Sequence, residues 1–259
     1  MKSIIKLFFI AIVFQNISCL AFDDTKLQEA QSYYQQGLNS KTLFQRKLNF
    51  NKALGLYLEI ENIYGESSEN LFESIGNNFY QVNEFAWAIL YYHRVLSINP
   101  SNASVEQRLK LAQNKLGLPP TFEPNAMNRI LSLNNIFPLS RRIVLLFFVT
   151  IISFIVCSIA IWFSGSFWKK LSAVMLGFEA LLVVNLILTM YFSPLEGIIV
   201  NPTGLFQATD MNQPQITATP LVKGIKVKII ETQKEGNWLK ILNPEGTVGF
   251  VPAGVVEII

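Results

Sequence analysis

Apolar positions change their spacing along the chain and divide it into stretches of different character. A short apolar run, residues 7–14, lies near the N-terminus, and residues 22–120 carry apolar positions at helical spacing. Residues 141–163 and 171–193 are almost wholly apolar, and residues 197–259 carry the short, alternating runs typical of strands. The pattern predicts an all-α region, then two membrane-length helices, then an all-β domain.

The first 21 residues have the pattern of a secretory signal peptide. Lys2 and Lys6 flank the start of the apolar run, which ends in small residues up to Ala21. We expect cleavage after Ala21, with lipidation at Cys19 or retention as an uncleaved anchor as the alternatives. In each case the residues that follow are expected to be exported.

The two long apolar runs predict a helical hairpin across a membrane. Each run is about 20 residues, the length a helix needs to cross the hydrocarbon core. The turn between them, residues 164–170, contains Lys169 and Lys170, as expected of a cytoplasmic turn. A hairpin returns the chain to its starting side, so both folded regions are expected on the outer side of the membrane.

Glu179 lies near the middle of the second apolar run, where an ionisable side chain is costly. We interpret it as an intramembrane helix contact, together with small Gly177 and Ala173. Ser153 and Ser158 on the first run are the expected hydrogen-bond partners. The alternative is a proton or ion path that uses Glu179.

Residues 70–100 contain two apolar helical stripes around a predicted turn at 81–84. The stripes consist of Phe72, Ile75, Gly76 and Phe79, and then Phe85, Ala88, Ile89, Tyr92 and Val95, with Pro100 as the helix stop. This pattern resembles a tetratricopeptide repeat. A less regular copy precedes it, with an insertion at 38–49, and residues 104–116 predict a capping helix. The resemblance implies a tetratricopeptide domain over 22–120, followed by a linker over 121–140.

Tetratricopeptide repeats bind a peptide or a partner helix on their concave face. In the clear repeat, the resemblance assigns that face to Asn70, Glu73, Asn77 and Tyr80. Glu73 stands where a carboxylate-binding clamp has a basic residue, so capture of a C-terminal carboxylate is not expected. The alternative is an ordinary hydrated surface. His93 is expected to face solvent.

Two motifs define the C-terminal domain: Gly-Asn-Trp-Leu-Lys-Ile at 236–241 and Gly-Thr-Val-Gly-Phe-Val-Pro at 246–252. They resemble those of a bacterial SH3 domain, a small all-β barrel, here over residues 197–259. The resemblance implies a shallow peptide groove made of Phe206, Trp238, Phe250 and Pro252. The alternative is that these aromatic side chains only close the barrel.

Composition argues against several classes of function. The net charge of +3 comes without a basic block, so no nucleic-acid partner is expected. The two cysteines, Cys19 and Cys157, lie in the leader and the first long apolar run, and His93 is the only histidine. A thiol nucleophile or a multi-histidine metal site is therefore not expected. Phosphate-loop and dinucleotide motifs are absent as well, so we expect no cofactor and no enzyme.

The order of leader, tetratricopeptide unit, two membrane helices and SH3-like barrel resembles the BatE-type proteins of bacterial aerotolerance (Bat) operons. The resemblance implies a multi-pass protein of the bacterial inner (cell) membrane with both folded domains in the periplasm. It also implies von Willebrand factor A-type membrane proteins of the same operon as partners. Three hypotheses follow: a non-catalytic scaffold that binds envelope proteins, a peptidoglycan-binding protein that recognises stem peptides, and an ion- or signal-transmitting subunit that uses Glu179.

Overall fold

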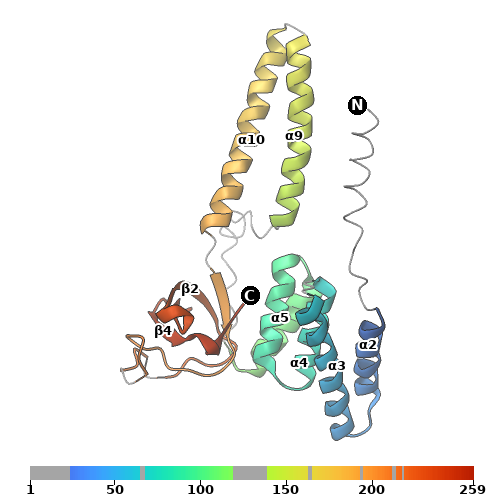
Figure 1. Ribbon diagram of the computed structural model, residues 1–259, viewed down its shortest axis with the longest axis vertical. Coiled ribbons are helices and arrows are strands. Elements are labelled where there is room, and N and C mark those ends of the chain that lie inside the picture. Colours follow the sequence, from blue (N-terminus) through green and yellow to red (C-terminus); the bar gives the residue numbers. More distant parts are fainter. Residues whose placement is uncertain are drawn as a thin grey trace, which may run out of the picture. The chain divides into compact units, whose positions relative to one another are not determined.

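The computed structural model divides into two compact units, residues 1–84 and residues 85–259 (Figure 1). The predicted signal peptide with Cys19 lies outside the described residues, as does the linker except for its last two residues, which begin a helix. The structure describes residues 24–64, 68–118, 139–162, 165–192, 195–211, 214–217 and 219–259.

The first unit is helical, with α2 (Asp24–Asn39), α3 (Leu43–Tyr64) and α4 (Glu69–Gln81). Helices α2 and α3 approach closely because Gly37 leaves room for an aromatic ring: a Cβ there would lie 2.7 Å from Phe50 Cε1. The Phe50 ring is fully buried and lies 5.4 Å from that of Tyr34. Residues 43–49 of the predicted insertion form the first two turns of α3. Just before this helix, Thr42 Oγ1 accepts a hydrogen bond from the Gln45 N–H.

Helix α4 follows the predicted apolar stripe. Its N-terminus is capped by Ser68, whose Oγ accepts a hydrogen bond from the Leu71 N–H at 3.3 Å. Phe72, Ile75 and Phe79 are buried as expected. The predicted turn at 81–84 is present, and it ends the first unit.

The second unit begins with α5 (Phe85–Ile98) and α6 (Ala103–Lys115), which pack against each other. Asn102 caps α6 by accepting a hydrogen bond from the Val105 N–H at 3.1 Å. Buried residues include Ala88, Ile89, Tyr92 and Val95 on α5 and Val105, Leu109 and Ala112 on α6. The helix predicted at 104–116 is therefore present within one residue at each end.

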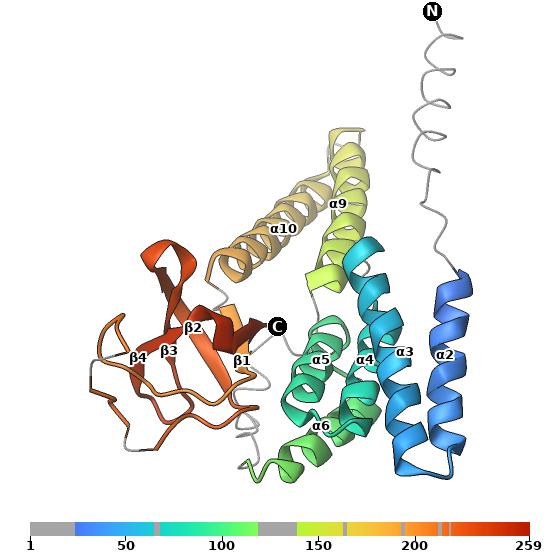
Figure 2. The same ribbon diagram turned by 60° about the horizontal axis from the view of Figure 1, so that its bottom comes forward.

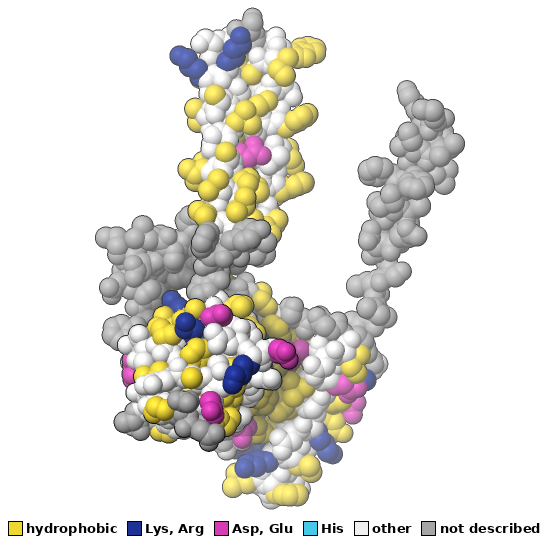
Figure 3. All heavy atoms as spheres, turned by 60° about the vertical axis from the view of Figure 1, so that its left-hand side comes forward, with side chains coloured by type: hydrophobic (Ala, Val, Ile, Leu, Met, Phe, Trp, Pro, Cys, Tyr) yellow, Lys and Arg dark blue, Asp and Glu magenta, His cyan; other side chains and the backbone are white. Residues whose placement is uncertain are grey.

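Helices α9 (Leu139–Trp162) and α10 (Ser166–Phe192) form an antiparallel pair and are long and apolar enough to cross a membrane. Only 11% and 0% of their apolar stretches are buried, unlike the core helices of a globular protein. Hydrophobic side chains cover the face of the pair that is visible in Figure 3. The turn predicted at 164–170 is shorter than expected: residues 166–170 belong to α10, because nothing after Gly165 interrupts the helix.

The C-terminal sheet is antiparallel, in the order β4-β3-β2-β1-β5 (Figure 2). Its strands are β1 (Leu195–Ile199), β2 (Lys226–Gln233), β3 (Trp238–Leu242), β4 (Val248–Pro252) and β5 (Val256–Ile258). A register shift between Ile229 and Glu231 bends β2, which helps the sheet to curl around its core. Core residues include Leu205, Val227, Ile229, Ile241 and Val251. Outside these strands, Phe206 forms isolated bridges with Gln215 and Phe250.

Candidate functional site

The four residues predicted to form the SH3-like groove lie together in the sheet domain. The rings of Phe206 and Trp238 meet edge to face, with centroids 5.9 Å apart. Phe206 and Phe250 exchange two backbone hydrogen bonds, each 2.9 Å, and Trp238 pairs with Pro252 across β3 and β4. The structure thus joins two strands and the preceding loop segment into one aromatic cluster.

This aromatic cluster lies on the face of β3 and β4 that points away from the hydrophobic core of the sheet domain. Side chains alternate along a strand, and Leu239, Ile241 and Val251 point into the core. Trp238 and Phe206 are nevertheless only 9% and 8% exposed, because they cover each other.

The accessible part of the aromatic cluster is its rim. Phe250 and Pro252 are half-buried, and the Nζ atom of Lys240 lies 6.0 Å from the centre of the Phe250 ring. A ligand would therefore meet Phe250, Pro252 and Lys240 first. Trp238 would support this surface from below.

The predicted surface of α4 is present as a stripe. Asn70 is exposed and Glu73, Asn77 and Tyr80 are half-buried, whereas the apolar residues between them are buried. Sequence reasoning missed Asn78, which is fully buried. Its Nδ2 donates to the Ser74 carbonyl at 2.8 Å, and its Oδ1 has no partner among the described residues.

The helix pair α9–α10 has a polar seam. Glu179 is half-buried, and its Oε1 lies 2.8 Å from Thr150 Oγ1; near the other end of the pair, Arg142 Nη1 donates to Asn185 Oδ1 at 3.3 Å. Thr150 Oγ1 also lies 3.0 Å from the Leu146 carbonyl. A hydroxyl has one proton, so Thr150 shares it between the Leu146 carbonyl and the Glu179 carboxylate.

The serine partners expected for Glu179 are wrong. Ser158 instead donates to the Phe154 carbonyl at 2.8 Å. Ser153 is 2% exposed, but its Oγ has no partner within the described chain. Thr150 was missed because a threonine in an apolar run is compatible with a bond to its own helix as well as to a neighbour.

Gly177 and Ala173 lie on a different side of α10 from Glu179. Both are exposed, and a Cβ at Gly177 would meet no atom within 4 Å. The predicted contact set is therefore divided: Glu179 joins α10 to α9, and the two small residues lie on a surface that α9 leaves open.

His93 does not face solvent, contrary to expectation. Its ring packs where α5 approaches the sheet, and its Nε2 is buried without a partner among the described residues. Burial and, secondarily, the positive charge of Lys226 lower the pKa of His93 to about 3. Lys226 forms an ion pair with Glu196, in which Nζ lies 2.6 Å from Oε2.

Two further contacts join α5 and α6 to the sheet domain. Arg94 Nη2 donates to the Ile258 carbonyl at 3.0 Å. Gly224 has a φ of +90°, and a Cβ there would lie 2.6 Å from Leu116 Cδ1 and 3.1 Å from Ile89 Cδ1. The chain segments on either side of the α9–α10 pair therefore form one packed contact, which we call the helix–sheet contact.

Among the described residues, no group of histidine, cysteine, aspartate and glutamate side chains could hold a metal ion. No protein-family model, curated protein or solved structure matches this chain.

Proposed function

We propose that the chain is a non-catalytic membrane scaffold that binds envelope proteins on the outer side of a bilayer. The observation that carries this proposal is the helix–sheet contact. Residues before α9 touch residues after α10, with Arg94 bonded to Ile258, so both lie in one compartment. If α9 and α10 each cross the membrane, the chain returns to its starting side, as this contact requires.

The leader predicted from the sequence supports a compartment outside the cytoplasm. Lys169 and Lys170 are in the first turns of α10, next to the link with α9, and Figure 3 shows basic side chains gathered at that end of the pair. These lysines agree with the tendency of basic residues to remain in the cytoplasm, whereas Arg141 and Arg142 at the other end of the pair do not, so the proposed orientation rests on the predicted leader. The protein would thus be an inner-membrane protein with both folded regions in the periplasm.

The binding surface that we propose is the rim of the aromatic cluster. Phe250, Pro252 and Lys240 combine apolar area with one positive charge, a combination that suits an extended peptide carrying a carboxylate. The resemblance to BatE-type proteins supplies the partner class, von Willebrand factor A-type membrane proteins. The open small-residue surface of α10 at Ala173 and Gly177 is available to a membrane helix of such a partner.

Co-purification of these partners from detergent extracts tests the proposal. Phe250→Ala is expected to reduce recovery of the von Willebrand factor A-type proteins about tenfold, because it removes the largest accessible apolar side chain of the rim. Val222→Ala, a truncation of another apolar side chain of this domain that is 51% exposed, should leave recovery unchanged. Failure to recover any of these partners with the unaltered protein would count against the proposal. Sedimentation with purified sacculi, abolished by Phe250→Ala, would favour peptidoglycan binding instead.

A further inference from the structure

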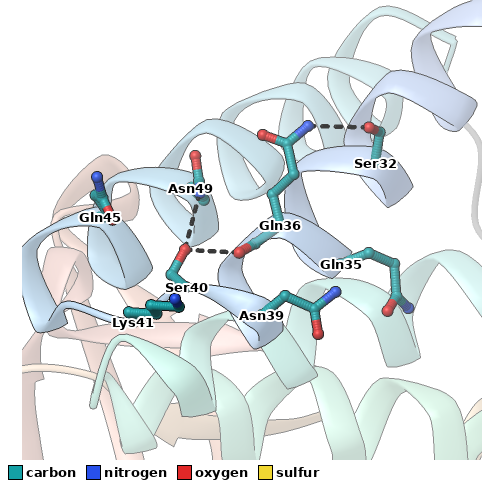
Figure 4. A pocket seen from close by; sticks show the side chains of 8 residues that line it. All are labelled: Ser32, Gln35, Gln36, Asn39, Ser40, Lys41, Gln45 and Asn49. Atoms are coloured by element: carbon teal, nitrogen blue, oxygen red, sulfur yellow. Dashed lines mark hydrogen bonds between the residues drawn. The ribbon is translucent and has the colours of Figure 1, made fainter.

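A polar cleft of about 610 Å³ lies where the chain turns from α2 into α3 (Figure 4). Its lining is built largely from side-chain amides and contains no acidic and no aromatic residue. The amides are those of Gln35, Gln36, Asn39, Gln45 and Asn49.

One wall of the cleft is held in place by internal hydrogen bonds. Ser40 Oγ donates to the Gln36 carbonyl at 2.6 Å and accepts from Asn49 Nδ2 at 3.2 Å. Gln36 Nε2 in turn donates to Ser32 Oγ at 3.2 Å. These bonds fix the position of the groups that a ligand would meet.

The other lining side chains have hydrogen-bonding capacity to offer. Within the described residues, the side chains of Gln35, Asn39, Lys41 and Gln45 are exposed and make no hydrogen bond. Each amide presents a donor and an acceptor, and Lys41 presents a charged donor.

The chain segment that forms the cleft carries a net positive charge. Residues 30–58 contain Lys41, Arg46, Lys47 and Lys52 but no aspartate or glutamate. Lys52 follows Gln45 and Asn49 on the same side of α3, and its Nζ lies 5.1 Å from the centre of the Tyr33 ring. Lys41 before α3 and Lys52 on α3 thus lie on either side of Gln45 and Asn49 in the sequence, and residues 30–58 contain no acidic side chain to neutralise them.

We propose that this cleft binds an extended, acidic segment of a partner protein. Peptide groups alternate donors and acceptors, which side-chain amides can pair, and carboxylates would pair with Lys41. Leu43 and Phe44, both 77% exposed and placed in the chain between the lining residues Lys41 and Gln45, offer apolar area to side chains of the same peptide.

Other classes of ligand fit the cleft less well than an acidic peptide. A lipid phosphate only accepts hydrogen bonds, so it would leave the amide oxygens without donors. A glycan would match the amides, but no aromatic side chain lines the cleft for a sugar ring to stack on. The proposal stands independently of the scaffold function, whose proposed surfaces are on α10 and the sheet.

The test uses the full chain in phosphatidylcholine nanodiscs and a labelled peptide of about ten residues that combines glutamates with leucines. Fluorescence anisotropy measures binding. Lys41→Glu should weaken it about tenfold or more, because one charge-assisted pair becomes a repulsion. Gln45→Ala, which leaves the charge unchanged, should weaken binding several-fold. Lys47→Glu is the matched control: the same charge change six residues further along the chain, at a residue that does not line the cleft.

The expected result is saturable binding that Lys41→Glu and Gln45→Ala reduce and Lys47→Glu leaves nearly unchanged. Equal losses from both lysine variants would show attraction by diffuse charge and overturn the proposal. So would equal binding of a peptide in which every glutamate is replaced by glutamine, or no saturable binding up to about 1 mM. Binding to vesicles that contain phosphatidylglycerol, without binding of the peptide, would instead make this end of the helices a membrane contact.

Discussion

Arg94 on α5 donates a hydrogen bond to the backbone carbonyl of Ile258 on β5, across 164 residues of sequence. The guanidinium also lies 4.9 Å from the centre of the Tyr91 ring, which holds it in place. The bond is a member of the helix–sheet contact, so the two ends of the second unit constrain each other. A membrane hairpin inserted between two touching segments cannot place them on opposite sides of a bilayer.

Gly224→Ala should weaken the helix–sheet contact. The new methyl group would meet Leu116 and Leu118 at less than 3 Å, on a backbone whose positive φ already disfavours alanine. We expect a loss of about 2–4 kcal/mol in the free energy of unfolding of the second unit, from strain plus overpacking.

Gly246→Ala is the control for this variant. Its φ is +85°, but no atom lies within 4 Å of the new Cβ, so it should show only the backbone strain of about 1 kcal/mol. The loss of stability in both variants is measured by hydrogen exchange of the β1 and β5 amides. Equal effects would mean that the packing of Gly224 against the helices contributes nothing.

The helix–sheet contact should weaken in acid because of His93. Its pKa is about 3 in the folded chain and 6.5 when solvated, so the unfolded or separated state binds the extra proton. The contribution of the neutral ring to stability is therefore complete above pH 6.5 and is lost as the pH falls from 6.5 towards 3. Protonation would also place a further positive charge near Lys226, whose own charge is paired with Glu196.

At pH 5 the expected loss is about 2 kcal/mol relative to pH 7. Amide exchange of β5, compared at the two pH values after correction for the intrinsic rate, measures it. His93→Phe should remove the part of the pH dependence that comes from His93, while the carboxylates of the protein continue to titrate. An unchanged pH profile in that variant would show that His93 is not the group responsible.

A second glycine pair tests the packing of α2 against α3. Gly37→Ala places a methyl group 2.7 Å from the Phe50 ring and should destabilise the first unit by about 1–3 kcal/mol. Gly55→Ala, on α3 with open space around it, should stabilise the helix by up to about 1 kcal/mol. Thermal unfolding followed by circular dichroism distinguishes them. Equal and small shifts would contradict the close approach.

Periodicity predicted most helices and strands because each buries a face whose spacing is written locally. The apolar stripe of Phe72, Ile75 and Phe79 predicted α4, and the alternation around Leu239 and Ile241 predicted β3. The aromatic cluster was predicted in another way, from the resemblance of its motifs to those of SH3 domains, and the structure places Trp238 and Phe250 on adjacent strands.

The environment of His93 could not be predicted in this way, because its neighbours on β1 and β2 are more than 100 residues away. One signal was present. Ala86, Leu90 and Tyr91 are apolar residues outside the predicted stripe of α5, and all three are buried. A helix that is apolar on several sides has more than one partner.

The polar seam of the hairpin predicts different effects for two changes at Glu179. Glu179→Gln can still hydrogen-bond Thr150, so the thermal stability of the detergent-solubilised protein should be nearly unchanged. Glu179→Ala should reduce it by an amount corresponding to about 0.5–2 kcal/mol. A Glu179→Gln protein that remained assembled but lost a measurable proton flux would instead support the ion-path hypothesis.

The measurement that tests the account most directly is thiol accessibility in intact cells. In a chain with Cys19→Ser and Cys157→Ser, single cysteines replace Lys115 on α6 and Lys228 on β2, both exposed. We predict that a membrane-impermeant thiol reagent, applied from outside the inner membrane, labels both positions to the same extent. Labelling of one position from outside, with the other reached only after the membrane is permeabilised, would contradict the account.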